Sequence, residues 1–393
     1  AAMTLAVASA LPARTDEGVG VGRITVLPRV ITQDSELRVE QHARARYTVE
    51  RSLGAGAMGE VELGEDHDIG RRVALKRLSS GVQSPAAVAR FVDEVRTMGA
   101  LDHPNITPIY DVGRDERGRL FFTMKYVEGQ SLEHLIERLR RGDPQAHAQY
   151  PFARRLDVFV GILNALDYAH TQGILHRDIK PANIMLGEHG EVRLMDWGIA
   201  RRGGKSLSGG TTTQAERPDM THDGAVLGTP LYMSPEQARG DQAAIDARSD
   251  LYSAFVVLYE LLTLRRFVQE EGNVYATLKE VIAGRTLSSE TSEWCHPTQP
   301  PTPVEWRYFV RQGVRTDPEQ RFQSATEAVD MIEQIRSGRI KVNCPITFYK
   351  ATQNRIGKLA DASPKRFVIL MSAAGVSLLG LLGLAGVGLA ALV

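Results

Sequence analysis

The sequence contains little cysteine and no excess of charge of either sign. Its 393 residues include two cysteines, Cys295 and Cys344, too few for a disulfide framework and without the spacing of a zinc site. Lys plus Arg and Asp plus Glu each number 47, so the chain lacks the overall basic field typical of nucleic-acid binding. We therefore expect a reducing compartment and no nucleic-acid partner.

No compositional bias of a fibrous or disordered protein is present either. Hydrophobic residues make up 43% and charged residues 24%, which excludes collagen-like, mucin-like and wholly disordered chains. At about 150 residues per domain, the length predicts roughly two to three domains.

Charge is entirely absent from one long segment, 367–393. These 27 residues also lack His, Asn and Gln. As a helix they would span about 40 Å, more than the roughly 30 Å of a bilayer core, so we expect a transmembrane helix; a buried core helix is the alternative. Lys350, Arg355, Lys358, Lys365 and Arg366 precede it against the single acid Asp361, which predicts a basic juxtamembrane linker, 341–366, on the cytoplasmic side. The pattern predicts a single-pass protein of the cell membrane, either tail-anchored or followed by an outer domain.

The first 46 residues show no sustained period. Six arginines are balanced by five acidic residues, and we expect a mostly disordered arm. The apolar run 3–11 is reminiscent of a signal peptide but has no basic region before it.

The first pattern with chemical content is a set of glycines between two strand-like stretches. It reads Leu53, Gly54, Ala55, Gly56, Ala57, Met58, Gly59, Glu60 and Val61. A dinucleotide-binding fold would continue with a helix, whereas this chain continues as a strand. The pattern predicts a hairpin whose backbone N–H groups approach phosphate oxygens.

A lysine and a glutamate follow in apolar surroundings. Lys76 ends the run Val73–Lys76, and on this run alone it reads as a solvated lysine. From Ser84 and Pro85, apolar residues then recur at helical spacing to Leu101, with Glu94 among them. A carboxylate on an apolar face needs a partner, and Lys76 is a candidate.

Two acids, an amide and a lysine are concentrated between 175 and 198. Asp178, Lys180, Asn183 and Asp196 lie in short loops between apolar segments. Hard oxygen ligands of this kind suit Mg²⁺ together with substrate phosphates.

These residues belong to a longer ordered set. It comprises the glycine pattern, Lys76, Glu94, His176-Arg177-Asp178, Asn183, Asp196-Trp197-Gly198, Ser234-Pro235-Glu236, Asp250 and Arg321. The set resembles that of the bacterial, eukaryotic-like serine/threonine protein kinases. The resemblance implies an α+β, two-lobed kinase domain over residues 47–340, with a small β-rich lobe and a large helical lobe, followed here by the transmembrane helix.

The resemblance implies a role for each position. Residues Leu53 to Val61 would cover the phosphates of ATP, and Lys76, held by Glu94, would bind the α- and β-phosphates. Ala74, Val61 and Met185 would enclose the adenine, with Met124 as gatekeeper and the backbone of Lys125 to Val127 bonded to the base. Asn183 and Asp196 would hold Mg²⁺, with Mn²⁺ as an alternative. Asp178 would accept the substrate's proton, and Lys180 would steady the γ-phosphoryl group.

The same resemblance bears on substrate and regulation. Lys180 and Thr229 favour protein serine and threonine substrates, and Ala182 replaces a glutamate that selects basic substrates in some relatives. Arg177 would receive a phosphorylated residue, for which we expect Thr221 ahead of Thr211, Thr212 and Thr213. Asp223, two positions after Thr221, already supplies a negative charge.

Three readings of the function remain open. They are an active membrane-anchored kinase, a pseudokinase scaffold that binds ATP without turnover, and a small-molecule kinase of related fold. The presence of Lys76, Asp178, Asn183 and Asp196 argues against the pseudokinase. Thr229 and the Ser234-Pro235-Glu236 element argue against the small-molecule kinase.

Trp197 stands where Phe is usual, and its N–H needs a partner. Gly380, Gly383 and Gly386 form a small-residue strip that would allow a homodimer.

Overall fold

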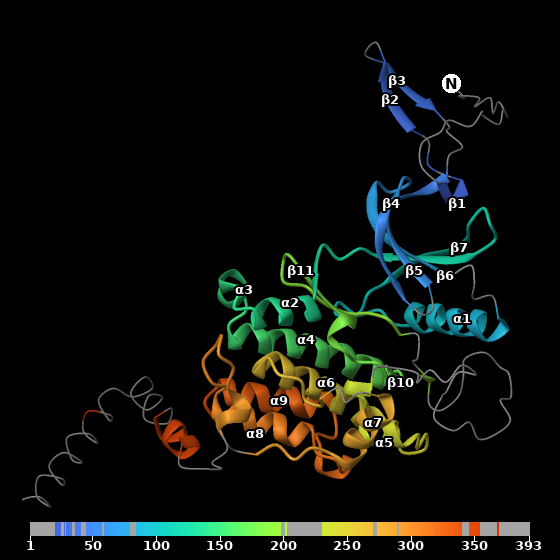
Figure 1. Ribbon diagram of the computed structural model, residues 1–393. Coiled ribbons are helices and arrows are strands. Elements are labelled where there is room, and N and C mark those ends of the chain that lie inside the picture. Colours follow the sequence, from blue (N-terminus) through green and yellow to red (C-terminus); the bar gives the residue numbers. More distant parts are fainter. Residues whose placement is uncertain are drawn as a thin grey trace, which may run out of the picture.

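The chain folds into a strand-rich lobe and a larger helical lobe (Figure 1). The computed structural model describes residues 20–24, 27, 29–33, 36–40, 45–56, 59–78, 84–197, 201–202, 230–269, 273–288, 291–339, 346–353 and 368. The kinase-like, two-lobed arrangement expected from the sequence is therefore present.

The small lobe is built on one antiparallel sheet with the strand order β1-β4-β5-β6-β8-β7. Its strands are β1 (Gly20–Ile24), β4 (Ala45–Gly56), β5 (Gly59–Asp66), β6 (Arg71–Leu78), β7 (Ile109–Arg114) and β8 (Leu120–Lys125). Register places Val61 opposite Lys76 and Ala74 opposite Met124. Because side chains alternate along a strand, all four of these residues share one face of the sheet.

The glycine pattern forms the turn of the β4–β5 hairpin, as predicted. Gly56 pairs with Gly59 across it. A Cβ on Gly59 would lie 2.1 Å from the carbonyl oxygen of Arg77, so the neighbouring strand requires a glycine there. A Cβ on Gly54 would meet nothing within 4 Å. Gly59 thus allows close packing against the neighbouring strand, and Gly54 borders open space.

Helix α1 (Pro85–Gly99) confirms the helix expected from the apolar spacing after Ser84. The Ser84 hydroxyl accepts the N–H of Ala87 at 3.3 Å, and Pro85 occupies the first helical position, where its missing N–H costs nothing. Phe91 and Met98 are buried beneath the sheet, in the same core as Ala74 and Phe122. This packing turns the Glu94 face of the helix towards β6.

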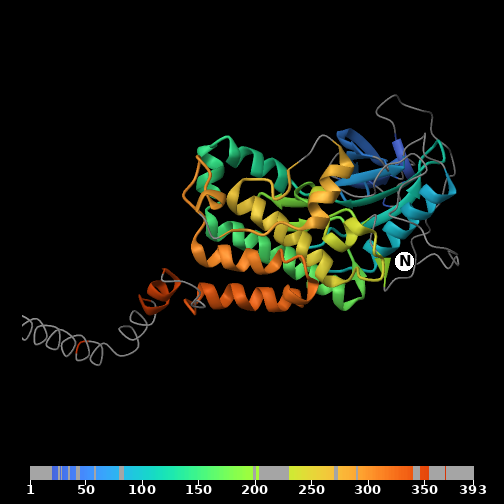
Figure 2. The ribbon, with the colours of Figure 1, turned by 60° about the horizontal axis from the view of Figure 1, so that its bottom comes forward.

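The helical lobe surrounds a helix that is buried along almost its whole length, α6 (Ala247–Thr263). Helix α4 (Phe152–Thr171) packs against α6 and against α9 (Ala325–Arg336), and α8 (Val304–Gly313) packs against α6. Figure 2 shows these helices side by side. At Gly313 a Cβ would lie 2.0 Å from the ring of Phe255, so the closeness of α8 and α6 depends on that glycine.

Shorter elements complete the lobe. The helices are α2 (Leu132–Arg140), α3 (Pro144–Gln149), α5 (Pro235–Arg239) and α7 (Val274–Ala283), with 3₁₀ turns η1 (Pro181–Asn183), η2 (Pro230–Tyr232), η3 (Thr291–Trp294) and η4 (Pro318–Gln320). The strands are β9 (Gly129–Ser131), β10 (Ile174–Leu175), β11 (Ile184–Gly187), β12 (Val192–Leu194) and β13 (Arg201–Arg202). Strands β9, β11 and β12 form a small sheet that frames the loops at Asp178 and Asp196.

The structure bears differently on the two terminal segments, the arm 1–46 and the expected transmembrane segment 367–393. The arm 1–46, expected to be mostly disordered, contains β1, which pairs with β4, and the hairpin of β2 (Arg29–Gln33) and β3 (Glu36–Glu40). Strand β1 is held by pairing with β4, and β2 and β3 pair with each other in a separate two-stranded sheet. The expected transmembrane segment 367–393 lies outside the described residues apart from Val368. Among the helices that are described, none combines the length and apolar character needed to cross a bilayer.

One buried ion pair ties α5 to the segment after η4. Arg321 donates to both carboxylate oxygens of Glu236, at 2.7 and 2.9 Å, and Ser249 donates to the same carboxylate at 2.6 Å. Both charged side chains are buried. Arg321 also bonds the carbonyls of Arg315 and Thr316, so every group that it buries has a partner.

We expect Arg321→Met to lower the free energy of unfolding by about 3–5 kcal/mol, because it leaves the Glu236 carboxylate buried without its cation. Arg336→Met is the matched control: it removes a surface pair with Asp157 and should cost less than about 1 kcal/mol. Denaturant unfolding followed by tryptophan fluorescence measures both. Equal losses in the two variants would contradict the structural role of the buried pair.

Candidate active site

A single ammonium group joins the two lobes. Lys76 Nζ, on β6, donates to Glu94 Oε1 of α1 at 2.6 Å and to Asp196 Oδ1, in the loop after β12, also at 2.6 Å. Lys76 and Glu94 are buried, and the Asp196 side chain is 45% exposed. The partner expected for Glu94 is therefore Lys76, and the solvated reading of that lysine is wrong.

The charges of this triad follow from its surroundings. Burial disfavours the charged Lys76, but Glu94 and Asp196 outweigh it and hold the pKa of Lys76 above its ordinary value. Burial raises the pKa of Glu94 to about 7, against the pull of Lys76. Burial also opposes ionisation of Asp196, but the Lys76 ammonium outweighs it and holds the pKa of Asp196 below its ordinary value. Asp196 is thus the carboxylate that stays ionised near neutral pH, as a cation-binding group must.

The loop before β11 gathers three of the expected residues. Lys180 Nζ donates to Asp178 Oδ2 at 2.7 Å, and Asn183 Nδ2 donates to the Asp178 carbonyl at 2.9 Å and to Oδ2 at 3.3 Å. The Asp178 side chain retains 12% exposure. A carboxylate held by an ammonium and an amide, yet still open to solvent, is positioned to meet a second molecule.

Backbone bonds connect this loop to the loop of Asp196. Met195 N–H donates to the Asn183 carbonyl at 2.9 Å, and the Met195 carbonyl accepts from His176 Nε2 at 3.0 Å. His176 Nδ1 in turn accepts the N–H of Asp178 at 3.3 Å, which assigns the ring proton to Nε2. Burial lowers the pKa of His176, so its imidazole stays neutral and keeps both bonds.

Asp250, on the buried helix α6, fixes the backbone of the same loop. Its carboxylate accepts the N–H of His176 at 2.9 Å and of Arg177 at 2.8 Å, and it bonds His170 Nε2 at 2.8 Å. Burial opposes its ionisation, but these donors outweigh it and hold the pKa of Asp250 below its ordinary value. Arg177 has φ 68°, a left-handed conformation that is unfavourable for a residue with a Cβ. The hydrogen bonds from His176 and Arg177 to Asp250 offset the backbone strain at Arg177 and fix the orientation of the neighbouring Asp178.

Asp196 has the same unusual conformation, with φ 64°. The next residue, Trp197, is fully buried, and its ring lies 4.5 Å from the His176 ring, centroid to centroid. Its indole N–H has no acceptor within the part of the chain that the structure describes. The partner that the sequence led us to expect for Trp197 is therefore not found there.

The expected nucleotide-binding residues lie on the small-lobe sheet, on the segment that follows β8 and, for Met185, on β11 of the large lobe. Ala74, Met124 and Val127 are buried, Val61 and Met185 are partly buried, and Leu53, Ala55 and Glu60 are exposed. Lys125 pairs with Val73 across the sheet, and its side chain bonds Glu191 at 2.6 Å. Ala57, Met58 and Gly198 lie outside the described residues.

The residues fit a magnesium–nucleotide ligand. Asn183 uses its amide nitrogen for Asp178, so its amide oxygen is the atom that can bind a cation, and the adjacent loop supplies the Asp196 carboxylate. Across the described residues, no group of three or more His, Cys, Asp or Glu forms a cage for a metal. One carboxylate and one amide oxygen suit a hard cation that keeps phosphate oxygens and water as its other ligands.

The regulatory residues are covered only in part. Arg177 Nη1 donates to Gln242 Oε1 at 3.2 Å, while Thr221 and Thr229 lie outside the described residues.

The sequence did not indicate His170 or Gln237 as positioning residues. Gln237 Nε2 donates to the Arg177 carbonyl at 2.9 Å, and His170 bonds Asp250. Ser234 and Gln237 form a Ser-x-x-Gln capping box, a local pattern that marks Gln237 at a helix start but does not indicate its bond to Arg177. No local pattern marks His170.

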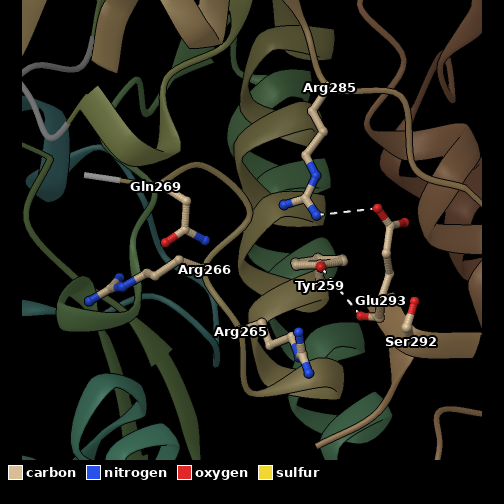
Figure 3. A pocket seen from close by; sticks show the side chains of 7 residues that line it. All are labelled: Tyr259, Arg265, Arg266, Gln269, Arg285, Ser292 and Glu293. Atoms are coloured by element: carbon tan, nitrogen blue, oxygen red, sulfur yellow. Dashed lines mark hydrogen bonds and ion pairs between the residues drawn. The ribbon is translucent and has the colours of Figure 1, made fainter. Parts of the chain in front are cut away.

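A polar cavity of about 300 Å³ lies elsewhere in the large lobe (Figure 3). Its lining includes Arg265, Arg266 and Arg285, each already bonded within the chain: to the Cys295 carbonyl, to Glu260, and to Glu293 with the Phe267 carbonyl. None of the expected active-site residues lines it.

Comparison with known proteins agrees with this geometry. Residues 47–332 match the family described as "Protein kinase domain". The chain is 38% identical over 298 residues to "Probable serine/threonine-protein kinase SCO3848" of Streptomyces coelicolor, covering 75% of this chain and 40% of that protein. It is 34% identical over 312 residues to serine/threonine-protein kinase PknD of Protochlamydia amoebophila, covering 76% and 30%.

A third relative is serine/threonine-protein kinase PknB of Mycobacterium leprae, 34% identical over 302 residues, with 76% of this chain and 44% of that protein covered. The chain thus spans less than half the length of these curated relatives. Since the family match covers more than half of the chain, this chain belongs to the protein kinase family.

Proposed function

We propose that this chain is a protein kinase that transfers the γ-phosphoryl group of ATP to serine and threonine hydroxyls of proteins, with Mg²⁺ or, alternatively, Mn²⁺. The observation that carries the proposal is the hydrogen bonding between the loop of Asp178 and the loop of Asp196. Lys76 bonds both Glu94 and Asp196. Met195, which precedes Asp196, donates its N–H to the carbonyl of Asn183, beside Asp178. The named relatives, all serine/threonine-protein kinases, support the substrate class.

In the proposed reaction each residue has one task. The oxygen of the substrate hydroxyl bonds to the γ-phosphorus while the Asp178 carboxylate accepts the hydroxyl proton. The bond between the γ-phosphorus and the bridging oxygen of the β-phosphate breaks, which releases ADP. Lys180, 2.7 Å from Asp178, lies where it can also neutralise the γ-phosphoryl oxygens. Lys76 exchanges Asp196 for the α- and β-phosphates while Glu94 holds it in place. Asn183 and Asp196 would hold the cation, which when bound would neutralise phosphate charge.

Nucleotide binding would use the sheet face and the hinge. Residues 53–61 would cover the phosphates, with Gly54 facing open space. Val61, Ala74 and Met185 would enclose the adenine beside Met124, and the backbone of Lys125 to Val127 would bond its edge. A pseudokinase scaffold is not favoured, because Lys76, Asp178, Asn183 and Asp196 are all present.

We expect Asp178→Asn to lower turnover about 10²–10⁴-fold with nucleotide affinity nearly unchanged, because the base acts in the transition state. Asp157→Asn, an exposed acid on α4, is the matched control and should be silent. Steady-state transfer to a generic protein and titration with a fluorescent ATP analogue separate the two quantities. An Asp178→Asn enzyme as active as its parent would remove the base assignment, and a parent that binds ATP without turnover would favour the scaffold.

We further propose that residues 367–393 anchor the chain in the cell membrane as a single-pass helix, with the kinase domain in the cytoplasm. The support is the uncharged sequence and the basic residues before it. The glycines at 380, 383 and 386 would allow a homodimer through this helix.

The full chain should remain with membranes through carbonate and high-salt washes, whereas a chain ending at Ser363 should be soluble, because the apolar segment is what holds it. Fractionation and immunoblotting measure both. A full chain recovered in the soluble fraction without detergent would contradict the anchor.

We also propose that phosphorylated Thr221 docks on Arg177 and orders the segment before Pro230. The guanidinium fork suits a phosphate, which carries a charge of about −1.5 to −2. We expect Thr221→Ala to lower activity, and mass spectrometry of the autophosphorylated parent should find phosphate on Thr221 ahead of Thr211, Thr212 and Thr213. Full activity with Thr221 unmodified would exclude the mechanism.

A further inference from the structure

A short helix after the kinase domain is fastened to α8. Residues 346–353 are helical, and Lys350 Nζ donates to both carboxylate oxygens of Glu305, at 2.7 and 2.9 Å. Thr347 and Ala351, one turn apart, are buried. The helix therefore has one face fixed on the large lobe.

Its other face is apolar and exposed. Ile346, Phe348 and Tyr349 are 57%, 60% and 61% exposed, three large apolar side chains within four positions. The Tyr349 hydroxyl accepts from Gln353 Nε2 at 2.6 Å, so the patch has aromatic rings and a polar end. Such amphipathic rings are typical of the boundary between hydrocarbon and headgroups.

The sequence that follows indicates what covers this patch. The uncharged run begins at Phe367, 14 positions after Gln353, so a fully extended linker reaches at most about 50 Å. Between them lie Arg355, Lys358, Lys365 and Arg366 against one acid, a charge pattern complementary to anionic headgroups. A bilayer tethered this close is present at high effective concentration.

We propose that Ile346, Phe348 and Tyr349 form a membrane-docking patch that seats the large lobe on an anionic bilayer. The inference rests on the proposed membrane anchor. Because Lys350 ties the helix to Glu305 of α8 and Thr347 is buried, insertion of the patch orients the whole kinase domain instead of leaving it on a free tether. The helix lies at the end of the molecule away from the small lobe, so docking there leaves the nucleotide-binding side facing the cytoplasm (Figures 1 and 2).

Depth-dependent quenching tests the patch in the full chain. Phe348→Trp and, independently, Tyr349→Trp place a reporter on it, and Ile69→Trp, at a position 58% exposed in the small lobe, is the matched control. Each variant is reconstituted into phosphatidylcholine–phosphatidylglycerol vesicles with and without brominated acyl chains. The native tryptophans Trp197, Trp294 and Trp306 are buried and give a common background.

We expect the two patch variants to show a blue-shifted emission and a loss of fluorescence with brominated lipid, while Ile69→Trp shows neither. A carbonate-resistant chain whose patch reporters are not quenched overturns the docking patch and leaves the anchor intact. A chain extracted by carbonate overturns both proposals. A blue shift without bromine quenching means that protein covers the patch, such as a second copy, and also overturns the inference.

Discussion

The shared ammonium of Lys76 is the interaction on which the site depends. It links a strand of the small lobe, helix α1 and the loop after β12 through two bonds of 2.6 Å each. Moving α1 away would leave Glu94 without its cation and Lys76 buried with one fewer carboxylate, which is costly in a poorly solvated place. The hairpin, the Ser84 cap and the packing of Phe91 all act to keep this one geometry.

The small lobe supplies the Lys76 ammonium, and the large lobe holds the backbone of the loop before Asp178 in place. Asp250 holds two successive N–H groups of the loop before Asp178, those of His176 and Arg177, and Gln237 holds the Arg177 carbonyl that follows them. Arg177 can therefore remain left-handed, and such strain is tolerated only where the surroundings over-determine it. The bond from Met195 to Asn183 then extends the same order to Asp196.

Local signals in the sequence were sufficient for α1, the glycine hairpin and the order of the chemical residues, because each depends on neighbours a few positions away. The bonds of His170 to Asp250 and Gln237 to Arg177 join residues 80 and 60 positions apart, and no local pattern encodes them. Strand β1 of the arm was missed for the same reason, since it pairs with β4, whereas β2 and β3 form a local hairpin that we did not recognise in the sequence. At Trp197 the sequence led us to expect a hydrogen-bond partner for the indole N–H, but among the described residues the ring contacts His176 and its N–H has no acceptor.

The central claim is transfer of phosphate to protein hydroxyls by the site around Lys76 and Asp178. Phosphoamino-acid analysis of a protein incubated with the chain, Mg²⁺ and ATP labelled in its γ-phosphate tests it most directly. The account predicts label on serine and threonine. Label confined to tyrosine, label found on a small molecule alone, or no label on protein at all would contradict it.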